Sequence, residues 1–248
     1  MKFPNLGDDN VLADARKFVD RYGDSGLALY AGIRPGTQPV YLSLGWEHFA
    51  ECQYNNRSLI EKMIDDYVEF NIRLVEKLRT IGFDFFFAYD DLAYKVGPLF
   101  NPNFYREMFL PKFQMLSDAY KLPWAYHSDG DLSRLMDDLL SLGMNAINPI
   151  EPPAMDIRWF KETYGKQVAI WGNIDIATTL SSGSVADVDS EVRERIRDIA
   201  PGGGYILATS NSITDFCKVE NILAMRDTLR RYGSYPIKHL EGDVSGAE

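Results

Sequence analysis

Polar side chains suited to acid–base or metal chemistry stand at the ends of five short apolar runs of the sequence. Asp90 and Asp91 end one run, His127 and Asp129 end the next, and Glu151 ends a third. Histidine and carboxylate groups can move protons, polarise a bound substrate or hold a divalent metal ion. His127 is the leading candidate because it is one of three histidines, ends an apolar run and precedes Ser-Asp-Gly.

The two remaining polar ends carry amides and a further acid. Asn173 stands with Asp175, and Asn211 lies between two serines. An aspartate or asparagine just after a strand can instead cap the helix that follows. That alternative is open for Asp91, Asp131 and Asp175.

The elements that must position these residues alternate along the chain. Apolar runs rich in β-branched or aromatic residues lie at 27–33, 84–91, 123–128, 146–151, 168–175 and 205–210. Because both faces of each run are apolar, they predict buried parallel strands. Helical periodicity at 58–81, 103–120, 132–142, 185–199 and 219–232 fills the intervals between them. This order is typical of α/β proteins.

Alternation of this kind permits a closed barrel or an open doubly wound sheet. No GxGxxG or GxxxxGK[ST] motif follows a predicted strand, and the glycines at 202–204 precede one. We therefore predict an α/β fold of the (β/α)8 TIM-barrel type, with about six of the eight βα units in this chain. In a barrel the carboxyl ends of all strands share one rim, so the polar side chains are expected to line a common cavity.

The length and composition of the chain agree with one globular enzyme domain. Of the 248 residues, 46% are hydrophobic and 25% are charged, and no Pro-, Gly- or Ser-rich linker divides the chain. We predict a single domain over 1–240 and a disordered tail over 241–248.

The net charge and the cysteine content limit which partners and which cellular compartment we expect. A net charge of -10 argues against nucleic acid and anionic membrane surfaces. Cys52 and Cys217 show no paired spacing, which argues against a disulfide framework or a cysteine-rich zinc site. With neither a signal peptide nor a membrane span in the sequence, we expect a cytoplasmic protein.

Four motifs occur in one order along the chain: HSDGD at 127–131, NPIEPP at 148–153, WGNID at 171–175 and PGGGYILATSNSI at 201–213. As a set they resemble the uroporphyrinogen decarboxylase superfamily, and the resemblance runs over residues 3–236. It implies a (β/α)8 barrel with the active site at the carboxyl ends of the strands. It also implies one of two activities, tetrapyrrole decarboxylation or methyl transfer to or from a corrinoid protein.

The sequence departs from both branches of that superfamily. The zinc-dependent methyltransferases carry His-x-Cys at His127 and position 129 and a second cysteine near Asn211, where this chain has Asp129 and Asn211. A metal such as zinc would then be held by His127, Asp129 and Glu151. The alternative is a hydrogen-bonded cluster that orients a small substrate.

The decarboxylase branch carries a histidine near Asn211 and an essential aspartate and arginines in an N-terminal segment that this sequence does not contain. A polycarboxylate tetrapyrrole also requires several cations, whereas Arg34 is the main one predicted at the rim. The resemblance therefore favours methyl transfer.

We expect a corrinoid-linked methyltransferase acting on a small methylated substrate. The catalytic residues are predicted to be His127, Asp129, Asp90 and Asp91. The substrate-binding residues are predicted to be Arg34, Trp46, Tyr89, Glu151, Asn173, Asp175 and Asn211, with the two aromatic rings stacking on a flat substrate. A partner protein would carry the corrinoid. A tetrapyrrole decarboxylase and a non-catalytic binding subunit are the alternatives.

The strand count adds an expectation about assembly. Six strands leave the first and the last of them, at 27–33 and 205–210, with unpaired edges that promote association. We therefore expect either a homo-oligomer or a fragment of a longer protein.

Overall fold

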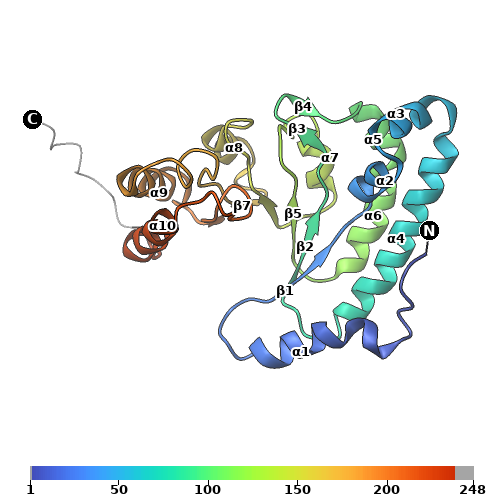
Figure 1. The fold of residues 1–248 in the computed structure, drawn as a ribbon, viewed down its shortest axis with the longest axis horizontal. Helices are drawn as coiled ribbons and strands as arrows, with labels where there is room; N and C mark the ends of the chain where they lie inside the picture. Colours follow the sequence, from blue (N-terminus) through green and yellow to red (C-terminus); the bar gives the residue numbers. More distant parts are fainter. Residues whose placement is uncertain (1, 238–248) are drawn as a thin grey trace, which may run out of the picture. The chain divides into compact units, whose positions relative to one another are not determined.

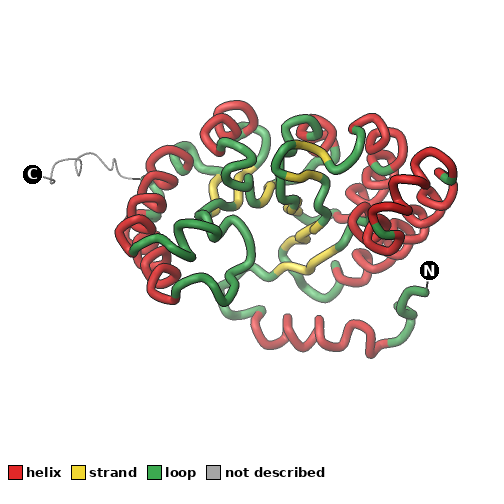
Figure 2. The backbone as a smooth tube through the Cα atoms, turned by 45° about the horizontal axis from the view of Figure 1, so that its top comes forward, coloured by secondary structure: helices red, strands yellow, loops and turns green. Residues whose placement is uncertain are grey.

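The computed structural model describes residues 2–237, and the chain forms two compact units (Figure 1). The first unit ends at Ala146 and the second begins at Ile147. Each alternates strands with helices, as the sequence predicts (Figure 2). The predicted tail at 241–248 lies outside the described residues.

The sheet strands of the first unit are β1 (Tyr30–Ile33), β2 (Phe85–Tyr89) and β5 (Trp124–His127), parallel and in chain order. In their register, Tyr89 lies opposite His127. Strands β2 and β5 are largely apolar on both faces, with Phe86 and Tyr126 fully buried, whereas β1 buries only Ala31 and Ile33. The polar residues that follow β2 and β5 consequently emerge side by side.

The helices of the first unit are α1 (Ala13–Tyr22), α2 (Thr37–Leu44), α3 (Trp46–Asn55), α4 (Arg57–Leu78), α5 (Pro102–Met108), α6 (Leu110–Tyr120) and α7 (Met136–Ser141), with a 3-10 turn, η1 (Asp9–Leu12). The predicted helix at 103–120 is divided at Phe109. Pro111 explains the break, because it lacks an N–H and its ring clashes with the carbonyl four residues earlier. A small antiparallel hairpin, β3 (Ala93–Tyr94) and β4 (Gly97–Pro98), follows β2.

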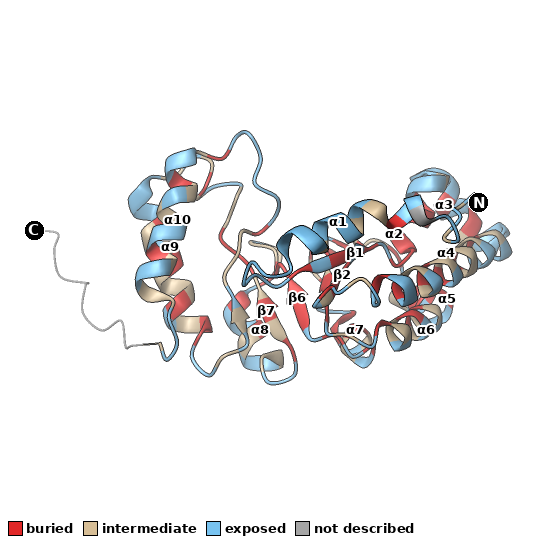
Figure 3. Cartoon of the chain, turned by 90° about the horizontal axis from the view of Figure 1, so that it is seen from below, coloured by how far each residue is buried: buried red, intermediate tan, exposed pale blue. Residues whose placement is uncertain are grey.

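The second unit contains all of β6 (Ala146–Asn148) but its first residue, together with β7 (Ala169–Trp171), β8 (Tyr205–Ile206), α8 (Ile157–Tyr164), α9 (Val185–Ile199) and α10 (Val219–Tyr232). Strands β7 and β8 are parallel. Helix α9 begins at a capping box in which Ser184 and Asp187 bond to each other's backbone N–H. Buried stripes on α9 and α10 face a core that includes Ile174, Val192 and Ile196 (Figure 3).

All six predicted strands are present, but each is shorter than its apolar run. Beyond the regular strands, pairing with the neighbouring strand continues at single residues: the Asp90 N–H donates to the His127 carbonyl, and Ile174 forms a bridge with Thr209. The sequence also failed to predict α1, α2, α3 and the hairpin. None of the described helices has both the length and the apolar character needed to cross a membrane.

Candidate functional site

Three ionisable side chains meet at the carboxyl ends of β2 and β5 in the first unit. His127 Nε2 lies 3.8 Å from Asp91 Oδ1 and 3.9 Å from Asp129 Oδ1. All three residues are half-buried. Both separations exceed hydrogen-bond length, so the three atoms are spaced as ligands around a common point would be. We call Asp91, His127 and Asp129 the carboxylate–histidine triad.

The triad's orientation is fixed from α2 and from the loop after β5. Asp91 Oδ2 accepts a hydrogen bond of 2.8 Å from Gln38 Nε2, and Asp91 Oδ1 accepts one of 3.1 Å from the N–H of Asp129. The hydroxyl of Tyr41 donates to the Asp91 carbonyl at 3.2 Å. Asp91 therefore does not cap a helix, which was the alternative reading of its position.

The Asp90 carboxylate lies against the N-terminus of α2. Its side chain is fully buried, and its two oxygens accept from the N–H groups of Thr37 and Gln38, the first residues of α2. Burial raises the pKa of Asp90 to about 7, although those N–H groups act in the opposite direction. Both oxygens bond to α2, so the Asp90 carboxylate anchors the N-terminus of that helix, and the catalytic role of Asp90 stays a prediction.

The aromatic residues predicted to stack on substrate lie in two settings. Tyr89 ends β2 beside the His127 ring, and burial together with the Tyr30 hydroxyl raises its pKa, so it remains a neutral phenol. Trp46 is not at a strand end: it begins α3, stacks on Tyr41 at 4.2 Å and is 49% exposed. Arg34 follows β1, is exposed and donates to Gln38 Oε1 at 3.2 Å.

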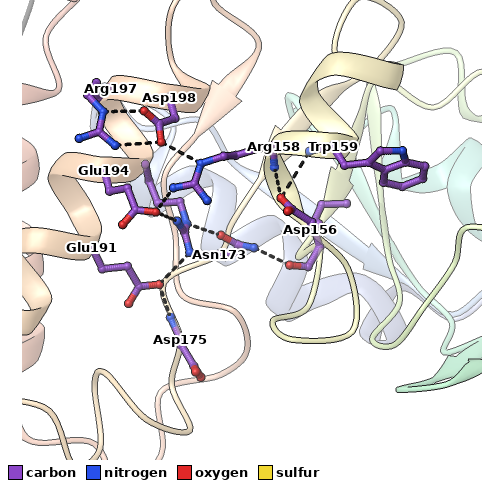
Figure 4. A network of polar contacts seen from close by, with 11 residues as sticks. Asp156, Arg158, Trp159, Asn173, Asp175, Glu191, Glu194, Arg197 and Asp198 are labelled. Atoms are coloured by element: carbon purple, nitrogen blue, oxygen red, sulfur yellow. Dashed lines mark hydrogen bonds and ion pairs between the residues drawn. The ribbon is translucent and has the colours of Figure 1, made fainter.

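In the second unit, Asn173 is the centre of a polar network (Figure 4). Its Nδ2 donates to the Ile150 carbonyl at 2.6 Å, and its Oδ1 accepts from Arg195 Nε at 3.0 Å. Arg195 also pairs with Glu191 and Glu194 on the same helix. With 1% of its surface exposed and both polar atoms engaged, Asn173 orders the loop after β7, and its role in substrate binding stays a prediction.

The other predicted residues of the second unit follow β6, β7 and β8. Asp175 accepts from the Ala177 N–H at 2.7 Å and from Thr178 Oγ1 at 2.6 Å, so it caps the turn that follows, as the alternative reading held. Asn211 is exposed and accepts from the Ser212 N–H. Glu151 is half-buried after β6, and its carbonyl accepts from the Met155 N–H.

The donor set of the carboxylate–histidine triad fits a divalent metal ion. One imidazole nitrogen and two carboxylate oxygens lie within 4.8 Å of one another. Zinc bonds of about 2.0–2.1 Å place tetrahedral ligand atoms about 3.4 Å apart, slightly closer than the present separations. Nitrogen and oxygen ligands suit zinc, manganese or iron. The third ligand grouped with His127 and Asp129 is Asp91, where the sequence had predicted Glu151.

The uroporphyrinogen decarboxylase family model, described as Uroporphyrinogen decarboxylase (URO-D), matches residues 35–232. The chain belongs to the URO-D family. No curated protein sequence matches it.

Two solved enzyme structures are similar in fold to this URO-D family member. A methyltransferase from Methanosarcina mazei has a TM-score of 0.76 and 18% identity, over 91% of this chain and 65% of that chain. A B12-independent methionine synthase from Shewanella sp. W3-18-1, in complex with selenomethionine, has a TM-score of 0.59 and 13% identity, over 93% of this chain and 68% of that one. This chain thus spans less than two thirds of the methyltransferase. The similarities show the fold, a partial (β/α)8 barrel.

Gln38 and Tyr41 are site residues of this URO-D family member that sequence reasoning missed. The sequence feature that indicates them is the segment Pro-Gly-Thr-Gln-Pro after β1. The chain turns at Gly36, and Pro39 lies in the first turn of α2. Gly36 has a φ of +144°, and a Cβ there would meet Ile64 Cδ1 at 2.5 Å. Only glycine allows α2 to begin this close to α4.

Proposed function

We propose that this URO-D family chain is a methyltransferase that moves a methyl group between a small methylated substrate and a corrinoid carried by a partner protein. The carboxylate–histidine triad is the observation that carries the proposal. It stands at the carboxyl ends of parallel strands, where barrel enzymes hold their reacting groups. The methyltransferase from Methanosarcina mazei has the same fold, which supports the proposal.

We further propose that the triad holds a divalent metal ion, with zinc as the leading candidate. His127 Nε2, Asp91 Oδ1 and Asp129 Oδ1 would be the ligands, and the remaining position would be open to substrate, as in catalytic zinc sites. A metal bound there supplies Lewis-acid polarisation of the substrate heteroatom.

Each side chain of the triad region has a task in this reaction. When the methyl carbon leaves the substrate heteroatom, the bonding electrons stay on the heteroatom, which must be stabilised or protonated. The metal that His127 Nε2 and the two carboxylates would hold would supply that stabilisation. The Tyr89 ring beside His127 offers an apolar wall, and the exposed Arg34 can pair with an anionic group of the substrate.

Metal binding tests the proposal first. We expect the purified chain, dialysed against zinc, to retain one ion per molecule by elemental analysis, and His127→Ala to lose it because the only nitrogen ligand of the triad is removed. Cys52→Ser and Cys217→Ser are the matched controls and should keep full zinc content, since neither cysteine belongs to the triad. Full zinc content in His127→Ala would exclude His127 as a ligand.

Turnover tests the reaction class. With candidate methyl donors and a reduced corrinoid, we expect methylcorrinoid to form, followed by its visible absorption, and the rate to fall with His127→Ala. Decarboxylation of uroporphyrinogen by the same preparation, without methyl transfer, would replace the proposal with the tetrapyrrole activity. Absence of both activities in the wild-type protein would indicate a non-catalytic binding subunit.

A further inference from the structure

We propose that Gln38 is a positioning residue of the metal site, which decides which oxygen of Asp91 faces the metal. The inference rests on the proposed function of the carboxylate–histidine triad. Gln38 Nε2 donates to Asp91 Oδ2 at 2.8 Å. The other oxygen, Oδ1, is the one that lies 3.8 Å from His127 Nε2. Holding Oδ2 thus presents Oδ1 to the metal.

The orientation of the Gln38 amide is itself determined. Its Oε1 accepts from Arg34 Nη1 at 3.2 Å, and its Nε2 points to a carboxylate. The guanidinium can only donate and the ionised carboxylate can only accept. A flipped amide would set N–H against N–H and oxygen against oxygen, so the arrangement between Arg34 and Asp91 admits one orientation.

The backbone of Gln38 is also held by hydrogen bonds. Its N–H and that of Thr37 donate to the buried Asp90 carboxylate, which directly precedes Asp91 in the chain. The carboxyl end of β2 therefore holds the backbone of Gln38 through Asp90 and also carries the Asp91 carboxylate that Gln38 orients. Half-buried at the first turn of α2, Gln38 has little freedom to move away from Asp91.

Removing such a hydrogen bond should weaken metal binding without changing the charge of the site. The amide is neutral, so the ligands keep their total charge when it is lost, and only the order of the Asp91 carboxylate changes. Partners that orient a metal ligand typically account for about 10–100-fold in affinity. That loss of order is the effect to measure.

The experiment measures zinc affinity of the full chain by competition with a chromophoric chelator. Gln38→Met keeps the length of the side chain and removes its hydrogen bonds, and we expect about 10–100-fold weaker zinc binding. The melting temperature of the metal-free protein should change little, whereas a purely structural role would lower it and leave affinity unchanged in the folded fraction. In the cobalt-substituted protein, the visible spectrum should shift because one ligand is less ordered.

Gln114→Met is the matched control. Gln114 Nε2 donates to Asp118 Oδ1 at 3.0 Å, so this variant breaks the same kind of bond on α6 and should bind zinc as the wild type does. Should Gln38→Met fold poorly, Gln38→Ala serves as the second variant and must show the same loss.

The outcomes separate this inference from the proposed function. If the wild type and His127→Ala both fail to hold zinc, the proposed metal site is wrong. If the wild type binds zinc through His127 and both Gln38 variants bind it equally well, the metal site stands and the role of Gln38 is overturned.

Discussion

The zinc site that the motifs resemble has two cysteines, and this chain has Asp129 and Asn211 at those positions. Asp129 occupies the position of a cysteine in the resembling zinc-dependent methyltransferases, so the ligand is a carboxylate oxygen instead of a thiolate. Thiolates favour zinc and other soft ions, whereas carboxylates also accept manganese and iron. We therefore infer that residue 129 sets the metal preference of the site.

Asp129→Cys should raise the preference for zinc over manganese. The thiolate strengthens the zinc bond and offers little to manganese, so the ratio of zinc to manganese affinity should rise by at least about tenfold. Competition titrations with both ions measure this ratio. Asp131→Cys, which places a thiol two residues further along the same loop, should leave it unchanged. An equal ratio in wild type and Asp129→Cys would show that residue 129 is not a ligand.

At the scale of elements, α9 is tied to the loop after β7 by one arginine. Arg195 reaches Asn173, while Glu191 on the same helix accepts from the Asp175 N–H at 3.2 Å (Figure 4). The side chains of Arg195 and Glu191 are only 14% and 13% exposed, so these contacts are shielded from water. They hold helix and loop together at the end of the strand.

Arg195→Met should destabilise the protein by about 1–3 kcal/mol, because it leaves the buried side-chain oxygen of Asn173 without its donor and removes the cation that pairs with Glu191 and Glu194. Arg197→Met is the control: Arg197 pairs with Asp198 on the same helix but is 56% exposed, so its loss should cost about 0–1 kcal/mol. Urea unfolding measures both. Equal losses in the two variants would contradict a structural role for the Arg195 network.

At the scale of the whole molecule, β1 and β8 stand first and last in the strand order of the described residues, and each pairs there with one strand. Strand β1 pairs with β2, and β8 pairs with β7. Apolar side chains are exposed at these ends: Leu27 is 70% exposed, Tyr30 42% and Ile206 50%. Open edges of this kind are ready to accept another strand. We propose that this chain forms homo-oligomers through them.

Light scattering after size-exclusion chromatography tests the proposal. We expect a mass above the 28.2 kDa of one chain, falling with dilution. Tyr30→Lys places a charge on the edge strand and should shift the protein toward monomer. Tyr54→Lys, at a 91% exposed position of α3, is the control. A monomer at every concentration, unaffected by either change, would refute association through the edge.

The strands and the polar residues at their ends could be predicted from the sequence, because both depend on short segments. Six apolar runs correspond to the six strands, and α9 and α10 have the predicted ends. His127 and Asp129, two residues apart at the end of β5, were likewise evident as potential ligands. Local patterns of apolar residues and the parallel direction of strands were sufficient for these features.

Only the tertiary structure decided which side chains contact one another. Gln38 and Asp91 are 53 residues apart and meet because α2 begins beside the end of β2. Asp90 and Asp91 look equivalent in the sequence, yet one is buried against α2 and the other faces His127. Successive residues at a strand end point in opposite directions, so their roles depend on what packs on each side. That packing is set by contacts distant in sequence, which a local pattern does not encode.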